Sequence, residues 1–220
     1  MKVELIAFTP NPERIAAMAA KLTHTSSTPE EVAETSDEKL GVILEEVMKR
    51  GHTSVIEHAT FTFAISGVSR ALTHQLVRHR IASYAQQSQR YVSISKPSYT
   101  TPKSILDNKE ALEEYNETIE RIWRCYNKLL KLGVPTEDAR YILPNATHSN
   151  IIVTMNARSL LNFFELRCCL QAQWEIRELA YKMLALVKKQ APNIFKNAGP
   201  PCKTKKICPE NKKDCPLYPK

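Results

Sequence analysis

Apolar residues in the N-terminal part of the chain recur at two spacings, that of a strand and that of a helix. They alternate with polar residues over residues 3–7 and again over residues 61–65, which predicts two strands. A proline in first position favours a helix over residues 12–22. Helical spacing predicts another helix over residues 37–50, and Gly51 supplies its end.

The middle of the chain predicts a short helix, a loop and the longest helix. An apolar line at helical spacing over residues 68–76 predicts a helix that carries Gln75 and Arg78 towards its C-terminal end. Residues 81–90 are polar and aperiodic, so we expect a loop there. The longest helix is expected over residues 112–129, where apolar residues recur every three or four positions.

The remaining elements are a short helix, a strand and two longer helices. Gly133 ends the longest helix, and the short helix that follows is expected to contain Arg140. Residues 151–153 predict a buried strand leading to Asn156, a candidate N-cap for the next helix. A last helix is expected over residues 174–190.

Helices dominate this pattern, and the expected fold is α/β (α+β): a single helix-rich domain around a small mixed sheet. A chain of 220 residues with 43% apolar residues can build one sizeable core. Five glycines are too few for an all-β sandwich full of tight turns. We expect the domain over residues 1–200 and a basic tail rich in Cys, Lys and Pro over residues 201–220.

The chain shows no targeting or membrane-spanning pattern. Its N-terminal segment, MKVELIAF, lacks the apolar core and the small-residue cleavage site of a signal peptide. No apolar run approaches the roughly 20 residues of a membrane span. Cys125, Cys168 and Cys169 lie inside helical patterns, where reduced thiols are ordinary in a reducing compartment. We therefore expect a cytoplasmic protein without a membrane partner.

The formal charge of +8 indicates an anionic partner, which leaves nucleic acid, nucleotides and phosphorylated cofactors in play. Half of the excess lies in residues 202–220, where six lysines stand against two acidic residues for a net of +4. The spacing of Cys202, Cys208 and Cys215 matches no standard zinc site, and a fourth ligand is missing. We expect a disordered basic tail and no metal, with a metal site as the alternative.

Cations are concentrated in one short segment of the chain. Arg78, His79 and Arg80 are followed after seven residues by Ser88, and then by Arg90. So many cations are costly to bring together unless anions neutralise them, and the planar fork of arginine suits phosphate and carbonyl oxygens. A solvated helix end, where cations complement the helix dipole, is the alternative. Composition alone does not decide between the two interpretations.

The spacing of this segment, RHRIASYAQQSQRYV, resembles the signature of the flavin-dependent thymidylate synthase family, in which RHR is followed after seven residues by Ser. Three further segments resemble the same family: GHTSVIEH with His52, Ser54, Glu57 and His58; Gly133 to Arg140; and Asn156 to Arg167. These ordered matches span roughly residues 40–190, which makes chance a poor explanation.

The resemblance implies a set of ligand contacts and an assembly. The positions that match contacts to FAD are His52, Ser54, Arg78, His79, Arg80, Gln86, Asn156, Arg158 and Asn162. The positions that match contacts to dUMP are Gln75, Arg78, Gln86, Ser88, Arg90, Arg140 and Arg167. Family members are homotetramers whose active sites lie between subunits, and this chain should be similar.

The reaction implied by the resemblance is the reductive methylation of dUMP to dTMP, a step of nucleotide biosynthesis. It uses tightly bound FAD, with NADPH and 5,10-methylenetetrahydrofolate as co-substrates, and it releases tetrahydrofolate. Uracil C5 is a poor nucleophile, and no cysteine here lies in a segment resembling the motif of the classical synthases. We assign the catalytic activation to Arg167, because a cation at the acidic edge of uracil stabilises its N3-deprotonated form.

Helical spacing agrees in part with these assignments. Arg158, Asn162 and Glu165 recur on one face of the helix that follows Asn156, whereas Arg167 points about 180° away. One helix can therefore address two ligands or two subunits. The alternative for Asn156 is a simple N-cap, which does not exclude a flavin contact.

Other single residues also have alternative interpretations. His52, beside Gly51, can equally be a histidine of a surface loop. Ser88 invites a nucleophile interpretation, but no adjacent base can be argued from the sequence, so we assign it to dUMP binding. Family sequences often have Asn and Glu where this chain has Ala85 and Gln86; an uncharged Gln can still bond a flavin or pyrimidine edge.

Two rival functions use the same residues. A module that binds RNA or DNA would read phosphates with these arginines, and it would show a salt-dependent affinity for long polyanions and no bound chromophore. A flavoprotein that oxidises NADPH without methylation would bind flavin but would not convert dUMP. We favour the synthase and expect no nucleic-acid partner.

Overall fold

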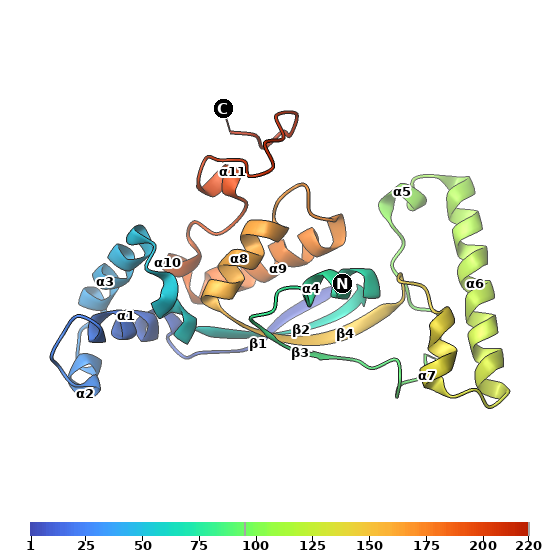
Figure 1. The fold of residues 1–220 in the computed structure, drawn as a ribbon, viewed down its shortest axis with the longest axis horizontal. Coiled ribbons are helices and arrows are strands. Elements are labelled where there is room, and N and C mark those ends of the chain that lie inside the picture. Colours follow the sequence, from blue (N-terminus) through green and yellow to red (C-terminus); the bar gives the residue numbers. More distant parts are fainter. Residues whose placement is uncertain (95, 220) are drawn as a thin grey trace. The chain divides into compact units, whose positions relative to one another are not determined.

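Four antiparallel strands and a larger number of helices make up the fold (Figure 1). The computed structural model describes residues 1–94 and 96–219. The strands pair in the order β1-β2-β4-β3, and their bounds are β1 (Lys2–Phe8), β2 (Thr60–Ser69), β3 (Ser83–Gln86) and β4 (His148–Asn156). The expected helix-rich fold around a small sheet is confirmed, although the sheet is antiparallel rather than mixed.

The helices range from single turns to the 23 residues of α6. The helices before β3 are α1 (Pro12–Leu22), α2 (Pro29–Ala33), α3 (Asp37–Arg50), the 3-10 helix η1 (Thr53–His58) and α4 (Arg70–Leu76). The helices between β3 and β4 are α5 (Lys103–Leu106), α6 (Lys109–Lys131), α7 (Thr136–Ala139) and the 3-10 helix η2 (Arg140–Ile142). The helices after β4 are α8 (Ala157–Arg167), α9 (Trp174–Gln190), α10 (Pro192–Phe195) and α11 (Pro201–Thr204).

The chain folds into two compact units, each assembled from separate segments. Unit 1 comprises Met1–Lys2, Ile65–Arg78 and Ala85–Ile152. Unit 2 comprises the rest of the described chain. The boundary between them cuts the cationic segment, because Arg78 belongs to unit 1 and His79 to unit 2.

Aromatic rings pack against one another within the core of unit 2. Phe61 of β2, Phe164 of α8 and Phe195 of α10 are fully buried. The ring centroids of Phe61 and Phe195 lie 5.5 Å apart, and those of Phe164 and Phe195 lie 6.0 Å apart, both in edge-to-face arrangements. Helices α8 and α9 pack together within unit 2 (Figure 1). Helix α8 is therefore held in unit 2 by the packing of Phe164 against Phe195 and by its contacts with α9.

Strand β4 alternates between buried and exposed side chains. Ile151 is 2% exposed and Val153 is buried, but Ile152 is 45% exposed. The prediction of a fully buried strand over residues 151–153 was therefore wrong for Ile152. A continuous apolar run is typical of strands covered on both faces, whereas an antiparallel strand covered on one face alternates.

Unit 1 is organised around the long helix α6. Trp123 and Tyr126 of this helix are buried, and Tyr99 lies with its ring centroid 6.4 Å from that of Trp123. The Tyr115 hydroxyl donates to the backbone oxygen of Thr100 at 3.0 Å. These contacts anchor the segment before α5 to α6, and α5 and α7 lie beside the same helix (Figure 1).

Most of the predicted helices are confirmed, and two predictions near the cationic segment were wrong. The helices over residues 12–22, 37–50 and 174–190 have the predicted bounds. Helix α4 ends at Leu76, so Arg78 lies just beyond it. The expected loop over residues 81–90 contains strand β3, whose pairing with β4 needs no apolar alternation of its own.

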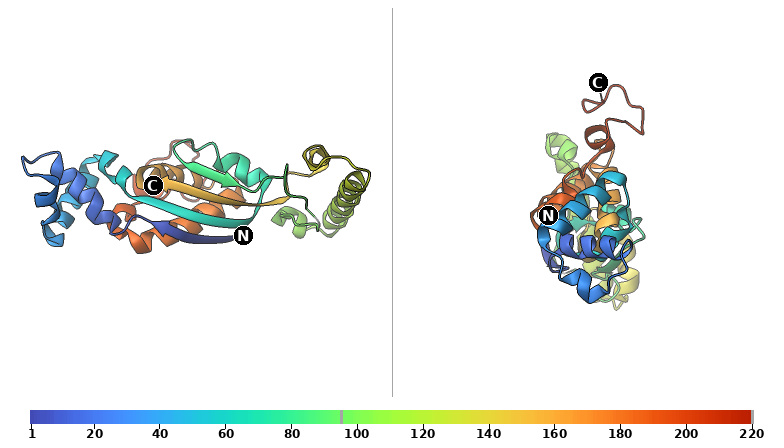
Figure 2. Two further views of the ribbon diagram at one scale, coloured as in Figure 1. Left: turned by 90° about the horizontal axis from the view of Figure 1, so that it is seen from below. Right: turned by 90° about the vertical axis from the view of Figure 1, so that its left-hand side faces the viewer.

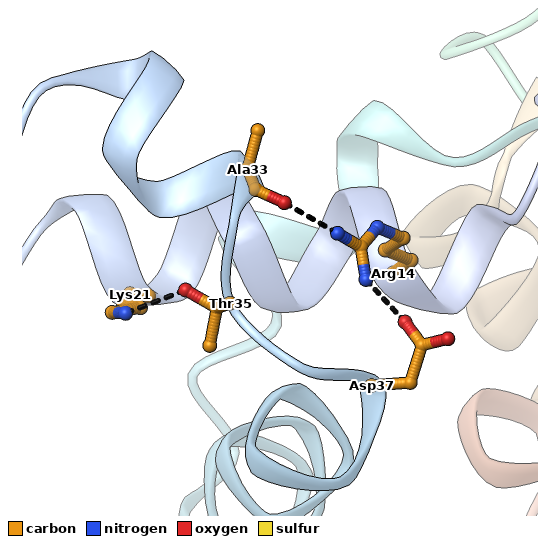
Figure 3. Close-up of polar contacts among 5 residues, drawn as sticks. All are labelled: Arg14, Lys21, Ala33, Thr35 and Asp37. Atoms are coloured by element: carbon orange, nitrogen blue, oxygen red, sulfur yellow. Dashed lines mark hydrogen bonds and ion pairs between the residues drawn. The ribbon is translucent and has the colours of Figure 1, made fainter.

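A polar cluster ties the connection between α2 and α3 to α1 (Figure 3). The Arg14 guanidinium donates to the backbone oxygen of Ala33 at 2.6 Å and to the carboxylate of Asp37. About two turns further along α1, the Lys21 ammonium donates to the Thr35 hydroxyl at 2.6 Å. Figure 2 shows α1, α2 and α3 side by side as a small helical group within unit 2.

The C-terminal tail carries defined structure, which corrects the expectation of disorder. Pro201–Thr204 forms α11, and the Lys205 ammonium bonds both oxygens of Glu165 at 2.8 Å. The sequence lacked a signal for this contact, because Lys205 and Glu165 are 40 residues apart. Within the described residues no group of three or more His, Cys, Asp or Glu side chains could hold a metal ion. No helix in the same residues is long and apolar enough to cross a membrane.

Candidate active site

The predicted site residues divide between the two units. Unit 1 contains most of the positions assigned to dUMP, namely Gln75, Arg78, Gln86, Ser88, Arg90 and Arg140. Unit 2 contains most of the positions assigned to FAD, namely His52, Ser54, His79, Arg80, Asn156, Arg158 and Asn162, together with Arg167. The two groups are described in turn.

In unit 1, Glu137 brings two predicted arginines to one place. The Arg90 Nε donates to the Glu137 carboxylate at 2.5 Å, and the Arg140 Nε donates to the Glu137 backbone oxygen at 3.0 Å. Arg140 follows α7 directly as the first residue of η2, so it lies one turn after Glu137. Both guanidinium groups are held through Nε, which leaves their terminal nitrogens free to receive an anion.

Ser88 begins the turn that presents Arg90. Its hydroxyl oxygen accepts a hydrogen bond from the backbone N–H of Arg90 at 3.1 Å, and its backbone oxygen accepts from Val92 at 3.1 Å. Within the described part of the chain, no side-chain base contacts this hydroxyl. In this geometry the Ser88 hydroxyl acts as a hydrogen-bond acceptor, and the assignment of Ser88 to dUMP binding stays a prediction.

A cavity of about 390 Å³ lies beside Ser88 within unit 1. Its lining includes Ser88, Lys96, His148, Ser149 and Asn150. Hydroxyl, amide and ammonium groups dominate this set, so the cavity suits a polar or anionic molecule.

Gln86 is held with a fixed orientation of its amide. Its Nε2 donates to the Thr73 hydroxyl at 2.9 Å and to the Ser149 hydroxyl at 3.0 Å. Thr73 already donates its own proton to the backbone oxygen of Arg70 at 3.0 Å, so its oxygen can only accept. Both Gln86 donors are therefore occupied, and its carbonyl oxygen is left to accept from a ligand.

The other two members of this group lie at the end of α4. The Gln75 Nε2 donates to the backbone oxygen of Ala71 at 3.3 Å. Arg78 follows the helix and is exposed. Arg80, the corresponding arginine of unit 2, is exposed as well. Neither Arg78 nor Arg80 forms an ion pair within the described residues, so both cations are available to an anion.

In unit 2, the GHTSVIEH segment supports the first turn of α8. Arg158 donates through Nη1 to Glu57 at 2.6 Å, and the backbone N–H of Ala157 donates to the oxygen of Ala59 at 2.8 Å. His52 and Ser54 are exposed at the start of this segment. The family-like segments that contain Glu57 and Arg158 thus meet in space, as members of one site must.

Asn156 caps α8. Its Oδ1 accepts from the backbone N–H of Ser159 at 2.8 Å, which confirms the predicted N-cap. Asn162, one turn beyond Arg158, is exposed and makes no hydrogen bond within the described residues. Arg158 and Asn162 therefore both remain accessible to a ligand.

Arg167, at the last turn of α8, contacts a different segment from Arg158. Its Nε donates to the Nε2 of His79 at 2.9 Å. Burial, and then the charge of Arg167, lower the pKa of His79 from 6.5 to about 4. Burial also lowers the pKa of Arg167, which nevertheless stays charged because arginine titrates far above neutral pH. The pair is thus a charged guanidinium beside a neutral imidazole.

Sequence reasoning missed the residues that hold these side chains in place. Glu57 and Glu137 lie inside the family-like segments but were assigned no role, and Thr73 and Ser149 were not noticed. The Glu137 carboxylate pairs with Arg90, 47 residues away, so no local spacing could have flagged it. The others depend on contacts distant in sequence.

Each unit thus presents an exposed arginine without a carboxylate partner among the described residues, Arg78 in unit 1 and Arg80 in unit 2, and such a cation suits an anionic ligand. Residues 4–193 match the model of the family described as thymidylate synthase complementing protein. The flavin-dependent thymidylate synthase of Geobacter sulfurreducens is 49% identical, covering 98% of this chain and 94% of the relative.

Two further relatives carry the same name. The flavin-dependent thymidylate synthase of Clostridium tetani is 47% identical over 98% of this chain and 93% of the relative. That of Pyrococcus abyssi is 41% identical over 96% of this chain and 90% of the relative. The chain belongs to the family of flavin-dependent thymidylate synthases, and it is an enzyme.

Proposed function

We propose that this chain converts dUMP to dTMP by reductive methylation, with tightly bound FAD, NADPH as the reductant and 5,10-methylenetetrahydrofolate as the one-carbon donor, and that it releases tetrahydrofolate. The observation that carries the proposal is the pair of Arg167 and His79, which holds a charged guanidinium in a partly buried place next to the predicted cofactor residues of unit 2. The family membership supports the same reaction.

The residues of unit 2 fit FAD. The exposed Arg80 lacks a carboxylate partner within the described residues and suits a pyrophosphate, and the accessible Arg158 and Asn162 suit the polar edges of a flavin. We assign His52, Ser54, His79 and Asn156 to the same cofactor, with Arg78 and Gln86 of unit 1. FAD, when bound, supplies the transfer of reducing equivalents and of the one-carbon unit.

The residues of unit 1 fit a pyrimidine nucleotide. Arg90 and Arg140 offer the terminal nitrogens of two guanidinium groups to a phosphate, and the Ser88 hydroxyl can donate while it accepts from Arg90. The carbonyl oxygen of Gln86 can accept from a pyrimidine N–H. We assign Gln75, Arg78 and Arg167 to the same nucleotide.

Arg167 is the residue that we propose for activation of the pyrimidine. A guanidinium lowers the free energy of negative charge on N3 and the adjacent carbonyl oxygen, and it pushes electron density towards C5 without titrating itself. A lysine could supply the charge but not the planar fork.

The assembly and the location complete the proposal. We infer a homotetramer whose active sites lie between subunits, supported by the resemblance on which the site assignments rest. We also infer a cytoplasmic enzyme, supported by six free cysteines, which are typical of a reducing compartment.

The test measures both half-reactions in the folded Arg167→Ala variant. Stopped-flow reduction of bound FAD by NADPH should be near normal, whereas dTMP formation should slow by roughly two to three orders of magnitude, as when a preorganised oxyanion donor is removed. Equal losses in both steps, or no loss in either, would contradict the assignment, because an arginine that merely stabilises a helix end affects both alike.

The same preparation separates the rival functions. Purified protein should show the absorption spectrum of oxidised flavin, and dTMP formation should require the folate. A flavin-bound protein that oxidises NADPH but never forms dTMP would be a different flavoprotein. Salt-dependent affinity for RNA or DNA without a chromophore would instead indicate a nucleic-acid-binding module.

A further inference from the structure

The guanidinium of Arg167 is held at one point only. Its Nε–H donates to the Nε2 of His79 at 2.9 Å, and no other hydrogen bond or ion pair of Arg167 occurs within the described residues. A long arginine side chain loses considerable rotamer freedom when it is fixed. The contact with His79 therefore decides where the two terminal nitrogens of Arg167 lie.

His79 is itself fixed by the helix that carries Arg167. Its ring meets the ring of Phe163 edge-on, with centroids 4.9 Å apart and an interplanar angle of 81°. Phe163 is fully buried and lies four residues before Arg167, so the two residues share one face of α8. The backbone oxygen of His79 also accepts from the Tyr84 hydroxyl at 2.8 Å.

The direction of the hydrogen bond fixes the proton on the imidazole. Arginine can only donate, so the Nε2 of His79 must be unprotonated, and the ring is neutral with its proton on Nδ1. Protonation of Nε2 would remove the acceptor and place two cations in contact. The lowered pKa of His79, about 4, agrees with this state.

We propose that His79 is a positioning residue for Arg167: its neutral, Nδ1-protonated ring holds Nε of the guanidinium so that the terminal nitrogens face the pyrimidine. This inference rests on the proposed function, because it presumes that Arg167 acts on the substrate. It adds to the predicted flavin contact of His79 a separate role for its Nε2, which accepts from Arg167.

A double-mutant cycle tests the proposal. His79→Leu removes the acceptor, whereas His79→Gln retains a carbonyl oxygen at a similar reach. With rates expressed per bound FAD, His79→Leu should slow dTMP formation about tenfold, the effect of losing one orienting hydrogen bond, and His79→Gln should restore most of the rate. In the Arg167→Ala background, His79→Leu should cause no further loss.

The outcomes separate this proposal from the one on which it rests. If Arg167→Ala leaves dTMP formation intact, the role of Arg167 fails. If Arg167→Ala is crippled while the losses of His79→Leu and Arg167→Ala multiply, His79 acts independently of Arg167, and only the positioning role is overturned. His24→Leu, which alters an exposed histidine of unit 2 remote from α8 in sequence, serves as the matched control and should behave as the unaltered enzyme.

A spectroscopic measurement addresses the proton directly. In protein labelled with ¹⁵N-histidine, with the His79 signal assigned by its loss in His79→Gln, the Nε2 shift should be that of an unprotonated nitrogen near neutral pH. A protonated Nε2 would overturn the proposal irrespective of any activity.

Discussion

Charged side chains of the site owe their orientation to partners far away in sequence. Arg158 meets Glu57 across 101 residues, Arg167 meets His79 across 88, and Arg90 meets Glu137 across 47. The two ion pairs among these are about half exposed, and such pairs contribute about 0–1 kcal/mol to folding. Their main effect is therefore to orient the guanidinium groups.

The lowered pKa of His79 predicts a pH dependence of stability. The unfolded chain protonates this histidine below about 6.5, but the folded chain does so only below about 4. Between these values the unfolded state binds more protons, so stability falls as the pH is lowered through this window and levels off below it. The unfolding temperature of the unaltered protein should thus decrease more steeply than that of His79→Gln, which cannot titrate.

Differential scanning calorimetry across this pH range measures the effect, with His24→Gln as the control for a histidine that is exposed. Equal slopes for the unaltered protein and His79→Gln would contradict the prediction. Carboxylates titrate in the same range, but they are common to all three proteins and leave the comparison intact.

At the residue scale the sequence names candidate site residues, but it does not reveal which side chains hold them in place. Arg90, Arg140 and Arg158 stand in motifs and could be found without a structure. Glu137 and Glu57 could not be assigned to them, because the pairings depend on tertiary contacts that no local spacing encodes.

At the element scale, α8 carries two arginines predicted to bind ligands, Arg158 and Arg167. The start of this helix is capped by the side chain of Asn156. Asn156→Ala removes the acceptor for the Ser159 N–H and should lower the free energy of unfolding by about 1 kcal/mol. Asn156→Asp keeps an acceptor and should retain most of the stability. Denaturant unfolding, with the bound flavin measured in each sample, gives both values; an equal loss in the two variants would exclude capping as the cause.

Element boundaries followed from the sequence where helices are long. Helices α1, α3 and α9 have strong periodicity and end signals, and their predicted bounds are confirmed. Helix α2 was missed because five residues cannot show a period, although Thr28 and Glu31 form a capping box. Strand β3 was missed because its four residues gain their structure from pairing with β4.

At the scale of the whole molecule, we expect the basic tail over residues 201–220 to contribute slightly to stability and hardly at all to activity. Truncation after Pro200 should leave dTMP formation largely intact, because the tail contains no motif of the family. The unfolding temperature should fall slightly, since the truncation removes the partly exposed pair of Lys205 and Glu165, worth about 0–1 kcal/mol, and the buried Pro201.

Activity assays and thermal unfolding of the truncated chain measure these effects, and Lys205→Ala isolates the ion pair. Stoichiometric zinc in the full chain, lost together with activity on truncation, would show that the tail is a metal site after all. The boundary at residue 200 stays a prediction until then.

The discontinuous units have a consequence for biosynthesis. The chain passes between the two units five times. Unit 2 combines the N-terminal part of the chain with α8, α9 and α10, which are synthesised late. While the ribosome is still making the last third, Phe61 of β2 has been synthesised without Phe195 of α10, against which its ring packs. A nascent chain with exposed aromatic strands is prone to aggregate. We therefore expect any aggregation of this chain to begin during its synthesis rather than after it has folded.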